Sequence, residues 1–307
     1  MKKLNLKDRV HESSLVGRLR ILTQRIILPG FGKAPLYDVG KFFFNGVQNS
    51  SLSMRASAVA FNFFLAIFPA IIFLFTLIPY IPIHGFQKEL MGMLADIMPE
   101  KTFEASKGVF NDILTRGRGG LLSLGFVLAF VFASNGIISL IRAFDATYHE
   151  IGRGSNFKRR MYSLLLVLIQ AILVIGCISL LAYFEVILKR LVHSGYHRGG
   201  FAGTSLTTAK WLLIVIFSYL GIAFLYFFGP SGKVRWKFIS AGATLATILS
   251  LATSAGFNYY VSRFATYNAL YGSIGTLIII LLWMYINALV LLIGFELNAS
   301  IYSAKKK

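Results

Sequence analysis

A small number of polar side chains interrupt the long apolar stretches of this chain, and they are the residues that could do chemistry. Glu296 is the most informative, because a carboxylate buried in a membrane must have a charged partner or take up a proton. The basic residues on its predicted side that could supply the charge are Arg55, Arg142, Lys233 and Arg235. A transport role and a structural ion pair are both open for Glu296, and Arg55 could instead anchor its helix in the lipid headgroups.

Further features of the apolar stretches predict kinks, breaks or hydrogen bonds between helices. Pro69 removes a backbone hydrogen bond in mid-stretch, which predicts a kink and a free carbonyl. Asn62, two turns earlier, either belongs to a pathway or bonds a neighbouring helix. Asn135 precedes Gly136, a pair that predicts either a break exposing backbone to a cavity or packing against a neighbour. The candidate pathway or coupling residues are Arg55, Asn62, Pro69, Asn135, Asn287, Glu296 and Asn298.

One apolar stretch carries a row of small residues. Gly242, Ala246, Ser250 and Ser254 follow one another at intervals of four, so they share one face of a helix. Small side chains let two helix backbones approach closely in a membrane. The row therefore predicts a packing face, and in a transporter the same face would also permit sliding.

Residues for catalysis or metal binding are sparse. His193 and His197 have the spacing of a metal pair, but the sequence HSGYH lacks the glutamate of the HExxH motif and no third ligand is evident. There is no phosphate loop and no GxSxG motif, and Cys177 is the single cysteine. We therefore expect no enzymatic activity, no metal and no cofactor.

The elements that must position these residues are membrane-spanning helices. Of the 307 residues, 56% are hydrophobic and 14% are charged, and the mean hydropathy is +0.68. A soluble protein could not hide so much apolar surface. Because about 20 apolar residues cross a ~30 Å hydrocarbon core, the sequence predicts an all-α polytopic membrane protein with six spans. They lie at about 57–82, 120–141, 163–187, 209–228, 238–258 and 272–298.

The distribution of charge predicts the orientation. The chain has 31 Lys and Arg against 12 Asp and Glu, a net charge of +19, and 21 of the basic residues lie before the first predicted span, in alternate loops and after the last span. The positive-inside rule therefore places both termini in the cytoplasm. This surface would contact anionic lipid headgroups, no nucleic-acid partner is expected, and a homo-oligomer is left open.

Three segments outside the spans have their own predicted roles. Residues 1–54 form a basic, amphipathic segment that lies either in the inner headgroup layer or against the bundle. Residues 83–119 are patterned as a helical hairpin on the outer face, which either covers a cavity or caps the bundle. Residues 301–307 are a basic tail that follows the transmembrane domain of residues 55–300.

Several stretches resemble one family of bacterial membrane proteins. They are RASAVAFNFFLAIFPAIIFL at 55–74, the region 142–166, and YNALYGSIGTLIIILLWMYINALVLLIGFELNAS at 267–300. These are similar to the YihY/BrkB family of inner-membrane proteins, also called the virulence factor BrkB family. The resemblance implies a six-helix integral membrane protein. Members have carried the label ribonuclease BN, widely regarded as a misassignment, while others are linked to serum resistance or to export or tolerance of envelope lipids.

Three functional hypotheses follow, in order of preference. The first is a protein that moves, or helps to move, a lipid or another anionic or amphipathic envelope component. The second is a scaffold that recruits envelope-assembly partners without transport, which predicts a solid core with no cavity at the membrane midplane. A ribonuclease comes third and is disfavoured.

Overall fold

The structure is a computed structural model that describes most of the spans predicted from the sequence. It covers 34–49, 51–80, 119–147, 155–193, 201–230, 237–263 and 273–306, with short pieces at 91–92, 104, 107–108, 111–112 and 117. All regular structure in these residues is helical. The all-α prediction is therefore confirmed. The predicted amphipathic helix before residue 34, most of the outer hairpin and the side chains of all five histidines lie outside the described residues.

A helix lies over each of the six apolar stretches. Among the described residues, five helices are long and apolar enough to cross a membrane, and α9 is not among them because Ala, Gly, Ser and Thr lower its hydropathy. The count of six spans and the cytoplasmic position of both termini stay predictions. The elements are α2 (Leu36–Asn49), α3 (Leu52–Leu77), the short 3-10 helix η2 (Ile78–Tyr80), α6 (Gly119–Thr147), α7 (Asn156–His193), α8 (Phe201–Phe228), α9 (Ala241–Arg263) and α11 (Ser273–Lys306).

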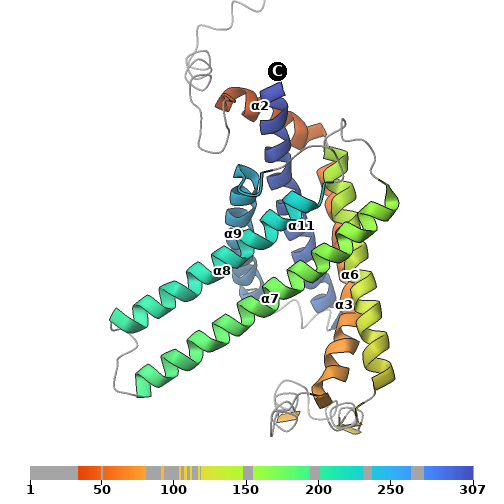
Figure 1. Ribbon diagram of the computed structural model, residues 1–307, viewed down its shortest axis with the longest axis vertical. Coiled ribbons are helices and arrows are strands. Elements are labelled where there is room, and N and C mark those ends of the chain that lie inside the picture. Colours follow the sequence, from red (N-terminus) through yellow and green to blue (C-terminus); the bar gives the residue numbers. More distant parts are fainter. Residues whose placement is uncertain are drawn as a thin grey trace, which may run out of the picture.

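The helices form two groups that diverge along their length. α3 packs along α6, and α11 packs against α9, α3 and α2. α7 and α8 pair with each other and slant away from the other helices as a long hairpin (Figure 1). This hairpin contacts the rest of the molecule mainly through α6 and α9, and Tyr226 of α8 also bonds α11. α2 lies across the end of the bundle beside the C-terminus.

The core lies at the end of the molecule where α6, α8 and α11 converge. The rings of Phe144 and Phe295 stack with centroids 4.3 Å apart, and Tyr226 meets both edge-on at 5.5 and 5.6 Å. The Tyr226 hydroxyl donates a hydrogen bond of 2.6 Å to the carbonyl of Leu291. Such aromatic contacts add about 0.5–1.5 kcal/mol per pair beyond the area they bury, so this end of the bundle is the rigid one.

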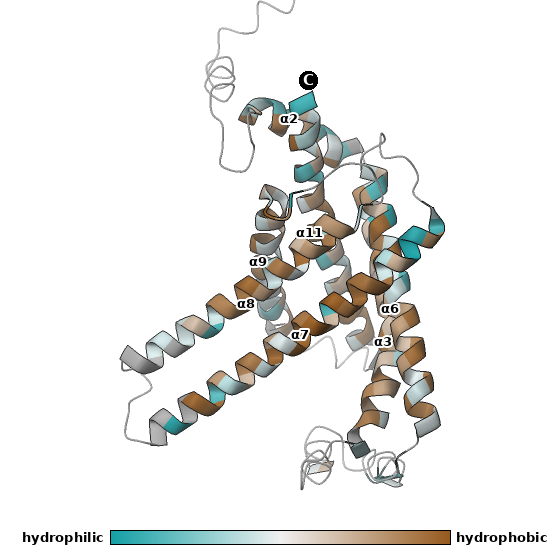
Figure 2. Cartoon of the chain, viewed as in Figure 1, coloured by the Kyte–Doolittle hydropathy of each residue, from teal (hydrophilic) through white to brown (hydrophobic). Residues whose placement is uncertain are grey.

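The residues of the α7–α8 hairpin are mostly hydrophobic (Figure 2). On α7, Ile172, Ile175 and Ile178 are each more than 60% exposed. Near the far end of the hairpin, Lys210 of α8 forms an ion pair of 2.9 Å with Glu185 of α7. A surface so apolar is stable only against lipid. The chain is therefore an integral, polytopic membrane protein.

Candidate functional site

Arg55 binds the C-terminal end of a neighbouring helix. It lies in the first turn of α3, and its Nη1 donates to the carbonyl of Ala143 at 2.7 Å and to the hydroxyl of Thr147 at 2.8 Å. Both acceptors are in the last turns of α6, and the Ala143 carbonyl also accepts from the Thr147 hydroxyl at 3.3 Å. A guanidinium at this place also meets the negative end of the helix dipole. Arg55 thus fastens α3 to the end of α6.

Glu296 lies beside this contact and is enclosed by four helices. It is 5% exposed on α11, Arg55 of α3 acts on its charge, and the Thr147 hydroxyl is within hydrogen-bonding reach. On the α2 side, a Cβ added to Gly46 would overlap the carboxylate, so a larger residue there would require the Glu296 side chain to move. The Oε2 atom of Glu296 has no hydrogen-bond partner in the described part of the chain. The carboxylate is thus both buried and incompletely bonded.

Polar contacts join α6 to the start of α7. Asp145 and Arg159 form an ion pair of 3.0 Å, with side chains only 11% and 14% exposed. Arg160 donates a hydrogen bond of 2.7 Å to Oδ1 of Asn135. α6 is unbroken at Asn135 and Gly136, and Gly136 packs against a ring of α3. The structure therefore shows the packing alternative for this pair, with no break.

The small residues of α9 face α11. Gly242 and Gly294 lie so close that a Cβ on either would strike the carbonyl oxygen of the other. Ala246 is fully buried one turn further along, and Ser250 donates to Oδ1 of Asn287 at 3.3 Å. Ser254, the last of the row, is partly buried.

Asn298 caps the start of α9 from across the interface. Its Oδ1 accepts from the backbone N–H of Gly242 at 2.8 Å, and its Nδ2 donates to the hydroxyl of Ser240 at 3.0 Å. The first N–H groups of a helix need such partners, because the helix itself supplies none. One amide therefore ties α11 to α9.

We expect Asn298→Ala to destabilise the protein by about 1–2 kcal/mol, because it leaves the Gly242 N–H buried and unbonded. Asn298→Asp keeps an acceptor at the helix start and should lose less. Unfolding in detergent, followed by intrinsic fluorescence, measures the difference. Equal loss in both variants would contradict the capping role.

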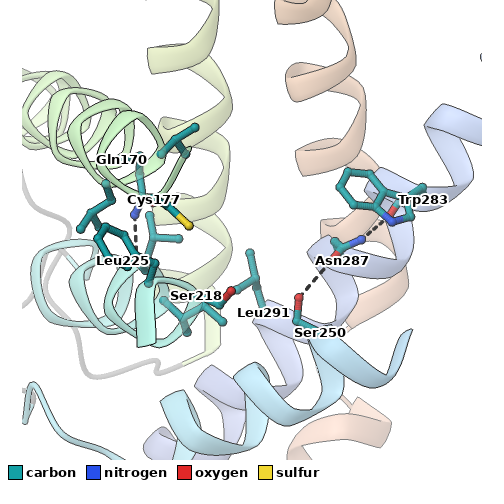
Figure 3. A pocket seen from close by; sticks show the side chains of 13 residues that line it. Gln170, Cys177, Ser218, Leu225, Ser250, Trp283, Asn287 and Leu291 are labelled. Atoms are coloured by element: carbon teal, nitrogen blue, oxygen red, sulfur yellow. Dashed lines mark hydrogen bonds between the residues drawn. The ribbon is translucent and has the colours of Figure 1, made fainter. Parts of the chain in front are cut away.

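A cavity of about 470 Å³ lies between the α7–α8 hairpin and the α9–α11 pair (Figure 3). Most of its lining is apolar. Gln170 of α7 donates across the hairpin to the carbonyl of Gly221 at 2.9 Å, and Asn287 donates to the carbonyl of Trp283 in its own helix at 2.9 Å. The lining residues are Gln170, Leu173, Val174, Cys177, Phe217, Ser218, Gly221, Ile222, Leu225, Ser250, Trp283, Asn287 and Leu291.

Two of the polar lining residues lie well inside their helices. Ser218 lies about ten residues before the end of α8, and Ser250 about ten residues after the start of α9. At 1.5 Å of rise per residue, each is roughly 15 Å from its helix end. Both residues therefore lie within the predicted spans, away from the helix ends.

The seven candidate pathway residues do not form one site. Asn287 lines the cavity, whereas Arg55 and Glu296 form the separate cluster at the bundle end. Asn62 donates to the carbonyl of Ala58 in its own helix at 2.8 Å, and Pro69 is buried within an α3 that continues past it. Neither Asn62 nor Pro69 lines the cavity.

Sequence reasoning missed two polar residues of the cavity, Gln170 and Ser218. Gln170 had a usable signal, because an amide in the middle of a highly apolar stretch needs a partner. Ser218 had none, since a lone serine satisfies itself within a helix.

The comparisons with known proteins match the regions that carry the resemblance. The family model described as virulence factor BrkB matches residues 43–307. The chain belongs to this family. No solved structure matches this BrkB-family protein.

Its relatives are bacterial. YfkH of Bacillus subtilis (strain 168), named as ribonuclease-like, is 28% identical over 82% of this chain and 90% of its own length. A protein of Tolumonas auensis, named a UPF0761 membrane protein, is 27% identical over 85% of this chain and 84% of its own length. A UPF0761 membrane protein of Haemophilus influenzae is 24% identical over 87% of this chain and 96% of its own length. The predicted family and membrane location are confirmed.

Proposed function

We propose that this BrkB-family protein binds part of a lipid, or of another anionic or amphipathic envelope component, between the α7–α8 hairpin and the α9–α11 pair, and moves it or helps to move it across the membrane. The cavity carries this proposal. Its volume of about 470 Å³ is within the ~300–1,000 Å³ typical of ligand sites. A scaffold without a transport role would need no such space between its helices.

The chemistry of the lining fits the apolar and ester part of a lipid. Aliphatic and aromatic side chains surround acyl chains without the need for hydrogen bonds. Gln170, Ser250 and Asn287 add neutral amide and hydroxyl groups that can bond ester oxygens. All the lining residues are neutral, so an anionic headgroup would lie outside the cavity, toward the basic cytoplasmic rim predicted from the sequence.

The arrangement of the helices supports movement at this place. The hairpin is joined firmly to the bundle at one end, where Tyr226 bonds α11 and the Tyr219 hydroxyl accepts from the N–H of Ser240 at 3.3 Å. Away from this end, apolar side chains of the hairpin such as Ile172 and Ile175 are exposed and would face lipid. Widening the cavity therefore needs only a displacement of the hairpin from the α9–α11 pair.

Reconstitution into liposomes with fluorescently labelled phospholipid tests the proposal. We expect the native protein to transfer label between leaflets faster than protein-free vesicles do. Ser218→Trp, which fills the cavity from α8, should reduce the transfer to the level of empty vesicles. The matched control is Ile216→Trp, because residue 216 is on the same helix and 54% exposed to lipid; it should keep the native rate.

Two outcomes would count against lipid movement. Transfer no faster than in empty vesicles would overturn the proposal and leave the scaffold hypothesis, which predicts co-purification of a defined partner. Equal transfer by Ser218→Trp and Ile216→Trp, with both proteins folded, would exclude the cavity as the route. The name of YfkH bears on the third hypothesis, a ribonuclease. The described residues contain no group of three His, Cys, Asp or Glu that could hold a metal ion.

A further inference from the structure

The carboxyl group of Glu296 does not line the cavity. It is 5% exposed, and its Oε2 has no hydrogen-bond donor among the described residues. A carboxylate held in an apolar interior without full hydrogen bonding is much less stable than the neutral acid. An interior carboxyl of this kind in a membrane protein is suited to holding a proton.

The groups that face Glu296 come from each helix packed around it. α3 contributes the positive charge of Arg55, and α6 contributes the hydroxyl of Thr147. α2 contributes Gly46, which has no side chain. α9 packs on α11 through its small, uncharged residues, and the acid of α6, Asp145, is paired with Arg159. Among the described residues, Arg55 is therefore the charged group that acts on this carboxyl.

Arg55 has two competing demands on its guanidinium. Its Nη1 is held by the carbonyl of Ala143 and the hydroxyl of Thr147 at the end of α6. Loss of a proton from Glu296 would create a negative charge beside it and draw the guanidinium from α6 toward α11. The protonation state of one carboxyl would thus decide which helix Arg55 holds.

We infer that Glu296 is a proton-binding site whose occupancy controls the Arg55 contact between α3 and the end of α6. The inference rests on the proposed function only in that the bound proton would be the ion coupled to lipid movement. Proton binding itself can be measured without any transport.

Infrared difference spectroscopy of the full chain in lipid nanodiscs, recorded between acidic and alkaline buffer, tests the site directly. We expect a C=O stretching band of a buried carboxylic acid that disappears on alkalinisation and is missing in Glu296→Gln. Glu185→Gln is the matched control, since Glu185 is half exposed and paired with Lys210, and it should keep the band. Arg55→Gln should retain the band to more alkaline pH, because the charge that favours the carboxylate is gone.

The outcomes separate this inference from the proposed function. Spectra of Glu296→Gln identical to those of the native protein would overturn the proton site, even if lipid transfer is intact. A band lost in Glu296→Gln but unmoved in Arg55→Gln would overturn the coupling between the proton on Glu296 and Arg55. The expected band and shift in a protein that transfers no lipid would support the site and contradict the proposed function alone.

Discussion

Gly294→Val should prevent this BrkB-family protein from folding stably. A Cβ at residue 294 would lie 2.6 Å from the Cβ of Ala246, 2.7 Å from the carbonyl oxygen of Gly242 and 2.5 Å from the Tyr226 hydroxyl. Two of these atoms, from Ala246 and Gly242, belong to α9 where it lies closest to α11. The clash can therefore be relieved only if α9 and α11 move apart. Overpacking a core costs about 1–3 kcal/mol and occasionally more, and we expect about 3 kcal/mol or more here. The thermal midpoint in detergent, read by size-exclusion chromatography, measures the loss.

Gly256→Val supplies the control for this prediction. Gly256 lies further along α9, and nothing is within 4 Å of where its Cβ would be. Its substitution should change stability by no more than ~0.5 kcal/mol. Equal midpoints for the two variants would show that α9 and α11 do not meet at Gly294.

Arg159→Met should be comparably destabilising, because it removes the guanidinium from a largely buried carboxylate. Asp145 is only 11% exposed, and Arg159 meets it at 3.0 Å. Breaking a buried ion pair from one side costs about 3–5 kcal/mol. The double variant Asp145→Asn with Arg159→Met removes both charges, and it should recover much of the loss. Unfolding of the native, single and double variants in one detergent gives the coupling as a double-mutant cycle.

A solvent-exposed ion pair provides the comparison for the stability contributed by the Asp145–Arg159 pair. Glu104 and Lys107 form an ion pair of 3.0 Å with side chains 60% and 53% exposed. Glu104→Gln should therefore change stability by about 0–1 kcal/mol. A loss in Arg159→Met as small as this would mean that the Asp145 pair is solvated.

The helices could be predicted from the sequence because length and hydropathy are local properties. Apolar runs of more than 20 residues leave helix as the one structure that satisfies the backbone in lipid. The packing face of α9 could also be predicted, because small residues at intervals of four lie on one face of a helix regardless of which helix packs there. The helix that packs on this face could not be predicted, because the role of Gly294 depends on its contact with Gly242 in the fold.

The cavity could not be predicted, for a physical reason. Between its charged ends, α7 is apolar on nearly every side, so apart from Gln170 its sequence does not mark which side faces a helix, a cavity or lipid. The angle at which the α7–α8 hairpin leaves the bundle depends on contacts with α6 and α9 that are distant in sequence. Glu296 could be singled out from the sequence because a buried carboxylate is energetically costly in a membrane. Its contact with Gly46 of α2 is known only from the fold. The outer hairpin at 83–119 remains a prediction.

The modest hydropathy of α9 has a consequence for how the protein is made. A helix rich in Gly, Ser and Thr partitions weakly from the translocon into lipid when it is alone. In the folded protein its polar groups meet Asn287 and Asn298 of α11, which the ribosome synthesises later. α9 would therefore have to wait at the translocon until α11 emerges, and the two would enter the bilayer as a pair. The contact that stabilises the mature bundle would in this way also set the order of its assembly.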